Sequence, residues 1–246
     1  MRAYFAGLEF VGDGGAATFT LGRNGLVGWF EGVGTRGEQT ARSVADGDHV
    51  SPAFLTGRLI TLTGLVLGAS TEAALSALSA LPRRTLGQFA VESDDSDTWA
   101  LVRRLDKPDI SVDAWGSAVS YQLRLYAPDP FRYGEEVISS SGTEVSIAHA
   151  GNTVAVPVIE VSGSMPSGYE IASQGKRYVV TQALTSGHTH VIDMANGFLT
   201  LDGDLQVGAV SRCETFTIPR GAGATVTITP VSGSGSIVVH TVDTWE

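Results

Sequence analysis

The stretch GRLITLTGLVLG at residues 57–68 decides the fold of this chain. It is rich in β-branched and apolar residues and has a glycine at each end, a pattern that predicts a strand bounded by turns. The same pattern recurs elsewhere, because 30 of the 246 residues are glycines scattered between short apolar runs, well above the roughly 7% average. Glycine supplies the backbone conformations that tight turns need. The sequence therefore predicts an all-β fold of many short strands.

One short helix is predicted directly after this strand, at residues 71–81. Ser70 or Thr71 can cap its start, and Pro82 ends it. Its apolar positions repeat at helical spacing and form one stripe; they are Ala74, Leu75, Leu78 and Leu81. We expect such a helix in a β chain to plug the end of a barrel or to cover a sheet.

The residues before the strand fall into two kinds of segment. Residues 1–34 alternate strand-length apolar runs, such as RAYFAGLEF at 2–10, with glycine-rich turns. Residues 35–52, TRGEQTARSVADGDHVSP, are polar and lack a helical period, so they are predicted to form an extended loop. A loop of this length is uncommon in a compact domain and often contacts another molecule.

The residues after the helix predict two further strand pairs and a domain boundary. GQFAVES and TWALVRRL form a hairpin around the acidic turn at 94–97, and residues 110–115 pair with 119–126. Two prolines in APDP at 127–130 stop the last strand. The polar, serine-rich residues 134–144 then predict a boundary between a domain at 1–133 and a second at 134–246.

The second domain is almost entirely strand and turn. Spacings of roughly 8–12 residues between strands indicate a β-sandwich or jelly roll. The predicted strands lie at residues 154–161, 178–181, 190–194, 215–218, 224–229 and 237–242.

The charge of the chain argues against several partners. Sixteen basic residues face 26 acidic ones, giving a formal net charge of −10, whereas phosphate backbones attract lysine and arginine. Nucleic acid and anionic membranes are therefore not expected as partners, and no apolar run reaches the about 18 residues of a membrane-spanning helix. The single cysteine, Cys213, lies in a β-like run and is predicted to be a small buried side chain.

Three motifs that could hold a cofactor or metal have plainer interpretations. The G-x-G-x-x-G match at 32–37 is followed by a polar loop and not by the helix that a dinucleotide site needs. His188 and His190 could share a strand face near Asp193, but a firm zinc site needs three or four ligands, and His149 and His240 are far away in sequence. We predict a turn followed by a partly exposed strand.

The acidic turn of Asp94, Asp95 and Asp97 lacks the glycine and glutamate of a calcium loop and is predicted to be a solvated hairpin tip. No nucleophile carries a local catalytic signature, and no pair of carboxylates is singled out. The sequence predicts no enzyme, and it gives no catalytic, cofactor-binding or metal-binding residue. Of the four tryptophans, Trp99 and Trp115 lie in predicted strands, and Trp245 is expected to be the most exposed.

Two motifs and the order of the parts resemble the distal tail proteins of long-tailed, siphovirus-type bacteriophages. The first is RLITLTG at 58–64 followed by the short helix, and the second is LRLYAPDPFRY at 123–133. The family also places similar elements in its second domain, at Gly163, Ile192-Asp193, Asn196-Gly197 and Ile218-Pro219-x-Gly221. The resemblance covers nearly the whole chain.

The resemblance implies an N-terminal split β-barrel that forms a ring, commonly of six subunits, and a C-terminal galectin-like β-sandwich that projects outward. Such a ring is a structural virion protein at the phage tail tip, made in the cytoplasm of the bacterial host. It joins the tail tube or tape-measure protein to the tail-hub protein, and no cofactor is implied. Strand edges and the segment 35–52 would make the contacts.

Two other functions are weighed against this adaptor ring. A carbohydrate-binding β-sandwich module of a phage or cell surface would need exposed aromatic residues such as Trp245. A hydrolase would need two acids that meet only in the folded chain.

Overall fold

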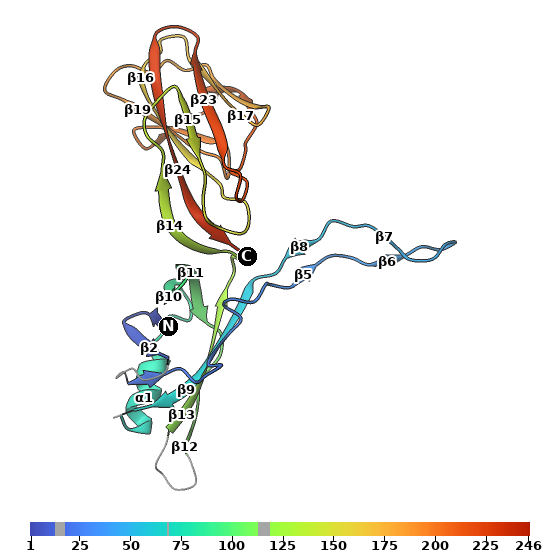
Figure 1. Cartoon of the computed structure of the whole chain (residues 1–246), viewed down its shortest axis with the longest axis vertical. Coiled ribbons are helices and arrows are strands. Elements are labelled where there is room, and N and C mark those ends of the chain that lie inside the picture. The colour runs from blue at the N-terminus through green and yellow to red at the C-terminus, as the bar shows by residue number, and fades with distance from the viewer. Residues whose placement is uncertain (13–17, 68, 113–118) are drawn as a thin grey trace. The chain divides into compact units, whose positions relative to one another are not determined.

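Strands dominate the computed structural model, which describes residues 1–12, 18–67, 69–112 and 119–246. The chain forms two compact units, Met1–Arg132 with Glu246 and Tyr133–Trp245 (Figure 1). The predicted all-β class with one short helix is confirmed. Among the described residues, no helix has the length and apolar character required to cross a membrane.

The first unit is built around a closed barrel of seven strands, in the order β13-β9-β3-β2-β1-β10-β11. It closes because β11 also pairs with β13, through Arg103↔Tyr126 and Arg104↔Leu125. The barrel strands are β1 (Arg2–Phe5), β2 (Leu8–Val11), β3 (Phe19–Thr20), β9 (Arg58–Val66), β10 (Gly87–Glu92), β11 (Asp97–Arg104) and β13 (Val119–Ala127), with β4 (Leu26–Val27) on β9 and β12 (Asp109–Val112) on β13.

The strand β9, which was predicted from residues 57–68, and its partner β13 are the two longest strands of the barrel, with nine residues each. The two strands pair antiparallel along their whole length, from Arg58↔Ala127 to Val66↔Val119. Alternate residues of β9 are buried, so Ile60 and Leu62 enter the core and Leu59 faces outward. The hairpin predicted around residues 94–97 is present as β10 and β11, with Glu92 opposite Asp97.

The backbone of β3 passes close to the inner side of β9 at Gly64. A Cβ atom on Gly64 would lie 1.6 Å from the carbonyl oxygen of Thr20, so only a glycine fits beside β3. The hydroxyl of the buried Tyr121 donates a hydrogen bond to the same carbonyl, at 2.9 Å. The glycine of the RLITLTG motif is therefore a packing requirement of the barrel.

The predicted helix is confirmed as α1 (Thr71–Ser79). The Ser70 side chain caps its start by accepting a hydrogen bond from the amide of Ala73, at 3.2 Å. Ala74 and Leu78 are buried in the barrel core, as is Leu81 just beyond the helix. The prediction is wrong for Leu75, which is 43% exposed, because the face that meets the core is narrower than the apolar stripe.

The run RAYFAGLEF forms two strands where the sequence predicted one. Ala6 and Gly7 make a two-residue turn between β1 and β2, with φ angles of 47° and 84° and with Phe5 opposite Leu8. Two consecutive residues of positive φ are typical of the tightest hairpin turn. Alanine rarely adopts this conformation, which is why the turn was missed.

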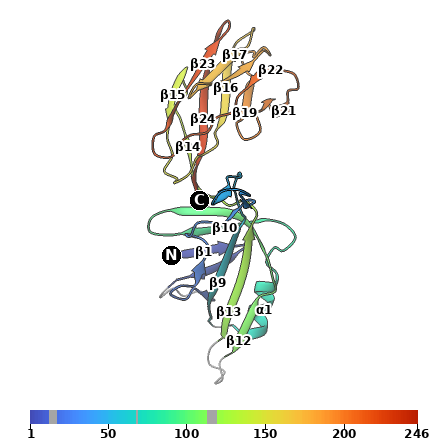
Figure 2. The same cartoon turned by 90° about the vertical axis from the view of Figure 1, so that its right-hand side faces the viewer.

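The second unit is a sandwich of two sheets, in the orders β14-β24-β16-β19-β20-β21 and β15-β23-β17-β18-β22 (Figure 2). Their strands are β14 (Arg132–Ile138), β15 (Glu144–Ile147), β16 (Val158–Ser164), β17 (Tyr169–Ser173), β18 (Lys176–Val180), β19 (Thr189–Asp193), β20 (Phe198–Leu201), β21 (Asp204–Leu205), β22 (Val210–Cys213), β23 (Ala224–Pro230) and β24 (Ser234–Trp245). The inward-facing side chains of the two sheets form one core.

The second half of the chain has two features that the sequence did not predict. Strand β14 runs through the polar segment 134–144 as far as Ile138. Residues 215–218 form no regular strand and contribute only the bridge Ala155↔Ile218. In both places the deciding pairings are with residues far away in sequence.

Candidate assembly surfaces

The most exposed part of the first unit is a long hairpin, residues 34–56, which we call the hairpin arm (Figure 1). It consists of β5 (Thr35–Arg36) paired with β8 (Phe54–Leu55), and β6 (Thr40–Ala41) paired with β7 (Asp48–His49). Thr56 closes its base by donating its amide to the carbonyl of Gly34, at 2.8 Å. The extended loop predicted for residues 35–52 is therefore a two-stranded ribbon.

The hairpin arm carries apolar side chains that are exposed to solvent. Val44 and Val50 are each 98% exposed and Phe54 is 62% exposed. The structure describes every residue of the arm, and none of them is buried. A lone two-stranded hairpin is marginally stable in water, and exposed apolar groups of this kind mark interaction sites. The arm is therefore a candidate for contact with another protein.

Arg58 joins the chain segments at the base of the arm. Its side chain is only 1% exposed. Nη1 donates to the carbonyls of Gly28, Trp29 and Glu31, at 2.9, 2.9 and 2.8 Å. Nε and Nη2 both donate to the carbonyl of Pro130, at 3.1 and 3.0 Å.

A second arginine, Arg132, lies beside this cluster. Its guanidinium carbon is 5.8 Å from the ring centre of Trp29 and 5.6 Å from that of Phe30, within the range of cation–π attraction. Burial, with the positive charge of Arg58 nearby, lowers the pKa of Arg132 to about 10. Trp29 itself is fully buried and donates its indole N–H to Thr98, at 3.2 Å.

The outer wall of the barrel exposes apolar side chains near the same base. Val27 of β4 lies opposite Thr61 of β9, so its side chain shares a face with that of Leu59, two residues along. Val27, Phe30 and Leu59 are each about half exposed, at 49%, 48% and 50%. Val27 and Leu59 on the wall, with Phe30 in the segment 28–31 that Arg58 bonds, are a second set of candidate contact residues, which we call the outer-wall patch.

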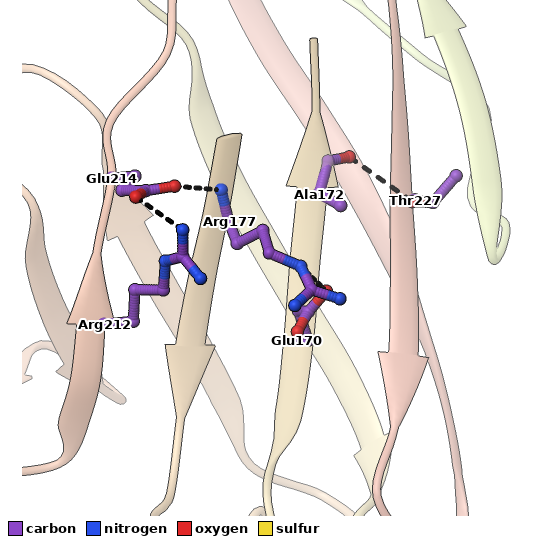
Figure 3. Close-up of polar contacts among 6 residues, drawn as sticks. All are labelled: Glu170, Ala172, Arg177, Arg212, Glu214 and Thr227. Carbon is purple, nitrogen blue, oxygen red and sulfur yellow. Dashed lines mark hydrogen bonds and ion pairs between the residues drawn. The ribbon is translucent and has the colours of Figure 1, made fainter. Parts of the chain in front are cut away.

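The second unit presents a polar sheet face whose charges are paired (Figure 3). Arg177 of β18 contacts Glu170 of β17 at 2.8 Å, and Arg212 of β22 contacts Glu214, two residues further along the chain, at 2.7 Å. Glu214 also accepts the amide of Arg177, at 2.9 Å. Arg212 and this amide hold the pKa of Glu214 below its usual range. Exposed pairs of this kind stabilise a fold little, and they leave these four charges satisfied.

The two histidines considered as metal ligands do not converge. His188 lies in an exposed turn, where its Nδ1 contacts a carboxylate oxygen of Asp202. His190 is fully buried, so the prediction of a partly exposed strand is wrong at this residue, and its Nδ1 lies 3.0 Å from the Tyr169 hydroxyl. Within the described ranges, no group of three or more His, Cys, Asp or Glu side chains is placed to hold a metal ion.

The buried His190 predicts a pH dependence of stability. Burial lowers its pKa below the ordinary 6.5, although Asp202 opposes the shift. Unfolding therefore takes up a proton below about pH 6.5, and the free energy of unfolding falls there by up to about 1.4 kcal/mol per pH unit. This slope is measured by denaturant titrations at pH 7.5, 6.5 and 5.5, in which hydrogen exchange of the β16 and β19 amides reports unfolding of the strands around His190.

The variant His190→Gln should remove most of that slope, whereas His49→Gln on the exposed arm should keep it. Equal slopes in wild type and His190→Gln would show that another group takes up the proton.

The remaining candidate residues are scattered. Asp94 and Asp95 lie at the exposed hairpin tip, as predicted. Cys213 is exposed and not buried, because it lies on the edge strand β22; it is paired with the buried Tyr178, and its thiol lies 3.8 Å from the carbonyl oxygen of Gly197. Trp99 and Trp245 are both half-buried, so Trp245 is not the exposed residue expected, and Trp115 lies outside the described residues. The glycine-rich motif at 32–37 runs into β5, not into a helix.

Arg58 opens the RLITLTG motif, but the sequence predicted no role for its side chain or for the valines of the arm. A basic residue opening an apolar strand directly after a glycine, and lone valines within a polar stretch, are the signals that could have identified them.

Comparisons with known proteins bear on the fold. No protein-family model matches the chain, and no curated protein is similar to it in sequence. Among solved structures, it is similar to the Dit protein of phage SPP1, described as a paradigm of the hub adsorption apparatus in phages that infect Gram-positive bacteria. That similarity has a TM-score of 0.74, covers 90% of this chain and 92% of that chain, and has 15% identity.

A chain of the phage P2 baseplate in its activated conformation is also similar over 85% of this chain and 87% of that chain, with a TM-score of 0.43 and 7% identity. A TM-score of that size does not establish a shared fold. The similarity to SPP1 Dit extends over both units. It confirms, at the level of the fold, the resemblance to distal tail proteins. This chain has the fold of the SPP1 Dit protein.

Proposed function

We propose that this protein is a structural component of a phage tail tip, a distal tail protein that forms an adaptor ring between the tail tube and the tail hub. The observation that carries the proposal is the fold shared with SPP1 Dit over 90% of this chain. The role is non-enzymatic, the site of action is the virion, and the partners are the tail tube or tape-measure protein and the tail-hub protein.

The surfaces of the first unit support self-assembly. The hairpin arm exposes Val44, Val50 and Phe54, and the outer-wall patch exposes Val27, Phe30 and Leu59. Because these two surfaces differ, contact between the arm of one copy and the wall of the next is head-to-tail. A head-to-tail contact closes into a ring when its rotation allows. The resemblance to distal tail proteins implies six copies, and on that basis we infer a ring of six.

The two domains, 1–133 and 134–246, are proposed to have separate roles. The barrel domain forms the ring, and the sandwich domain is left for contacts outside it. The paired charges of the sandwich face suit a surface that stays in water.

The ring is tested with the purified chain by mass photometry and negative-stain electron microscopy, alone and with tail-hub protein. We expect ring particles with a central hole. Because each copy carries a charge of −10, repulsion should weaken assembly at low salt and relax once the Debye length falls to about 8 Å near 0.15 M salt. A strictly monomeric mass at high protein and salt concentration, with hub protein present, would overturn the proposal.

A further inference from the structure

We propose that Arg58 is a positioning residue that sets the direction in which the hairpin arm leaves the barrel. The importance of this direction for assembly rests on the proposed function, because a head-to-tail ring requires each arm to meet its neighbour at one angle. Its physical basis lies wholly within the first unit.

The side chain of Arg58 links both ends of the arm to the barrel wall. Its own backbone begins β9 directly after the arm, and its Nη1 bonds the segment 28–31 that leads into the arm. Its Nε and Nη2 bond the carbonyl of Pro130, which follows β13. One planar group with donors on two sides therefore fixes three chain segments relative to one another.

The chemistry of the site favours a positioning role over simple packing. All five hydrogen bonds of Arg58 go to main-chain carbonyls, and burial lowers the pKa of Arg58. Burying a cation is costly unless every donor is satisfied. An apolar side chain would fill the space without that cost, but it could not hold the backbone on either side.

The arm is held at its base, where Thr56 also bonds the carbonyl of Gly34. Residues 34–56 contribute nothing to the barrel core, so the arm's direction depends on its base. At that base, the turn before the arm is already held close to β9. A Cβ atom on Gly28 would lie 1.9 Å from the carbonyl of Leu59, and the Gly28 amide donates to the Glu31 carboxylate at 2.8 Å. Arg58 ties this turn to the strand that leaves the arm.

The test measures the direction of the arm on the free chain by pulsed electron spin resonance. Spin labels are placed at Phe54→Cys in the paired base of the arm and at Leu101→Cys on the barrel, both exposed. The background is Cys213→Ser, because Cys213 is exposed and would also react. A second label pair, Leu75→Cys with Leu101→Cys, reports on the barrel alone.

With Arg58 present, we expect one narrow arm-to-barrel distance distribution. In Arg58→Met the distribution should broaden at least twofold, while the distance within the barrel stays unchanged. Arg58→Lys should also broaden it, because a single ammonium cannot bond Pro130 and the segment 28–31 together. The matched control, Arg23→Met, removes an exposed arginine of the same unit and should change neither distance.

A narrow, unshifted distribution in Arg58→Lys, or in a folded Arg58→Met, would overturn the inference, as would a distribution already broad in the parent chain. If Arg58→Met does not fold, the Arg58→Lys result decides. No ring is needed for this measurement, so its outcome is separate from that of the assembly experiment.

Discussion

Replacing residues 37–53 with an Asn-Gly turn is expected to leave the barrel folded and to abolish the ring. Arg36 and Phe54 are paired residues of the arm, so a two-residue turn can join them as in a tight hairpin. The change removes Val44 and Val50 without touching the core. Even a loss of about 1.4 kcal/mol weakens each contact tenfold, and a closed ring suffers that loss at every interface.

The measurement is sedimentation velocity across protein concentration, with circular dichroism to establish that the barrel remains folded. A milder variant, Val44→Ser with Val50→Ser, should weaken assembly by at least tenfold. Its matched control is Val207→Ser with Val231→Ser, because those valines are also highly exposed, at 90% and 69%, but lie in the sandwich unit. If the shortened chain forms rings at the concentration at which wild type does, the arm is not the contact.

Substituting Gly64 by alanine is expected to be the most damaging single change in the barrel. The added Cβ atom would lie 1.6 Å from the carbonyl oxygen and 2.6 Å from the carbonyl carbon of Thr20, both of them backbone atoms. A backbone cannot rotate aside as a side chain can, so β3 must move away from β9. We expect a cost of about 3 kcal/mol or more, at the upper end of overpacking changes.

Thermal unfolding measures this effect, and the midpoint of the barrel transition should fall by about 10 °C or more. The control is Gly32→Ala at the base of the arm, where no atom lies within 4 Å of the added Cβ. It should change stability by less than about 0.5 kcal/mol. An unchanged midpoint in Gly64→Ala would mean that β3 can shift without loss, and that the close approach does not hold the barrel.

Local signals in the sequence determined a large part of this fold. The strand β9, the helix α1 with its Ser70 cap, and the β10–β11 hairpin follow from residues that are neighbours in the chain. Alternation, capping and turn propensity act over a few residues, so these elements could be predicted with their approximate bounds.

Only the tertiary structure decided the features on which the proposed function depends. Arg58 bonds Pro130, which is 72 residues away, and β14 is a strand because it lies beside β24. His190 is buried because the two sheets of the sandwich close over it. The composition of residues 35–52 indicates a loop, yet they pair as a ribbon whose base Arg58 holds. Contacts between residues that are distant in the sequence depend on how the whole chain folds. Patterns that extend over only a few residues do not determine which distant residues will meet.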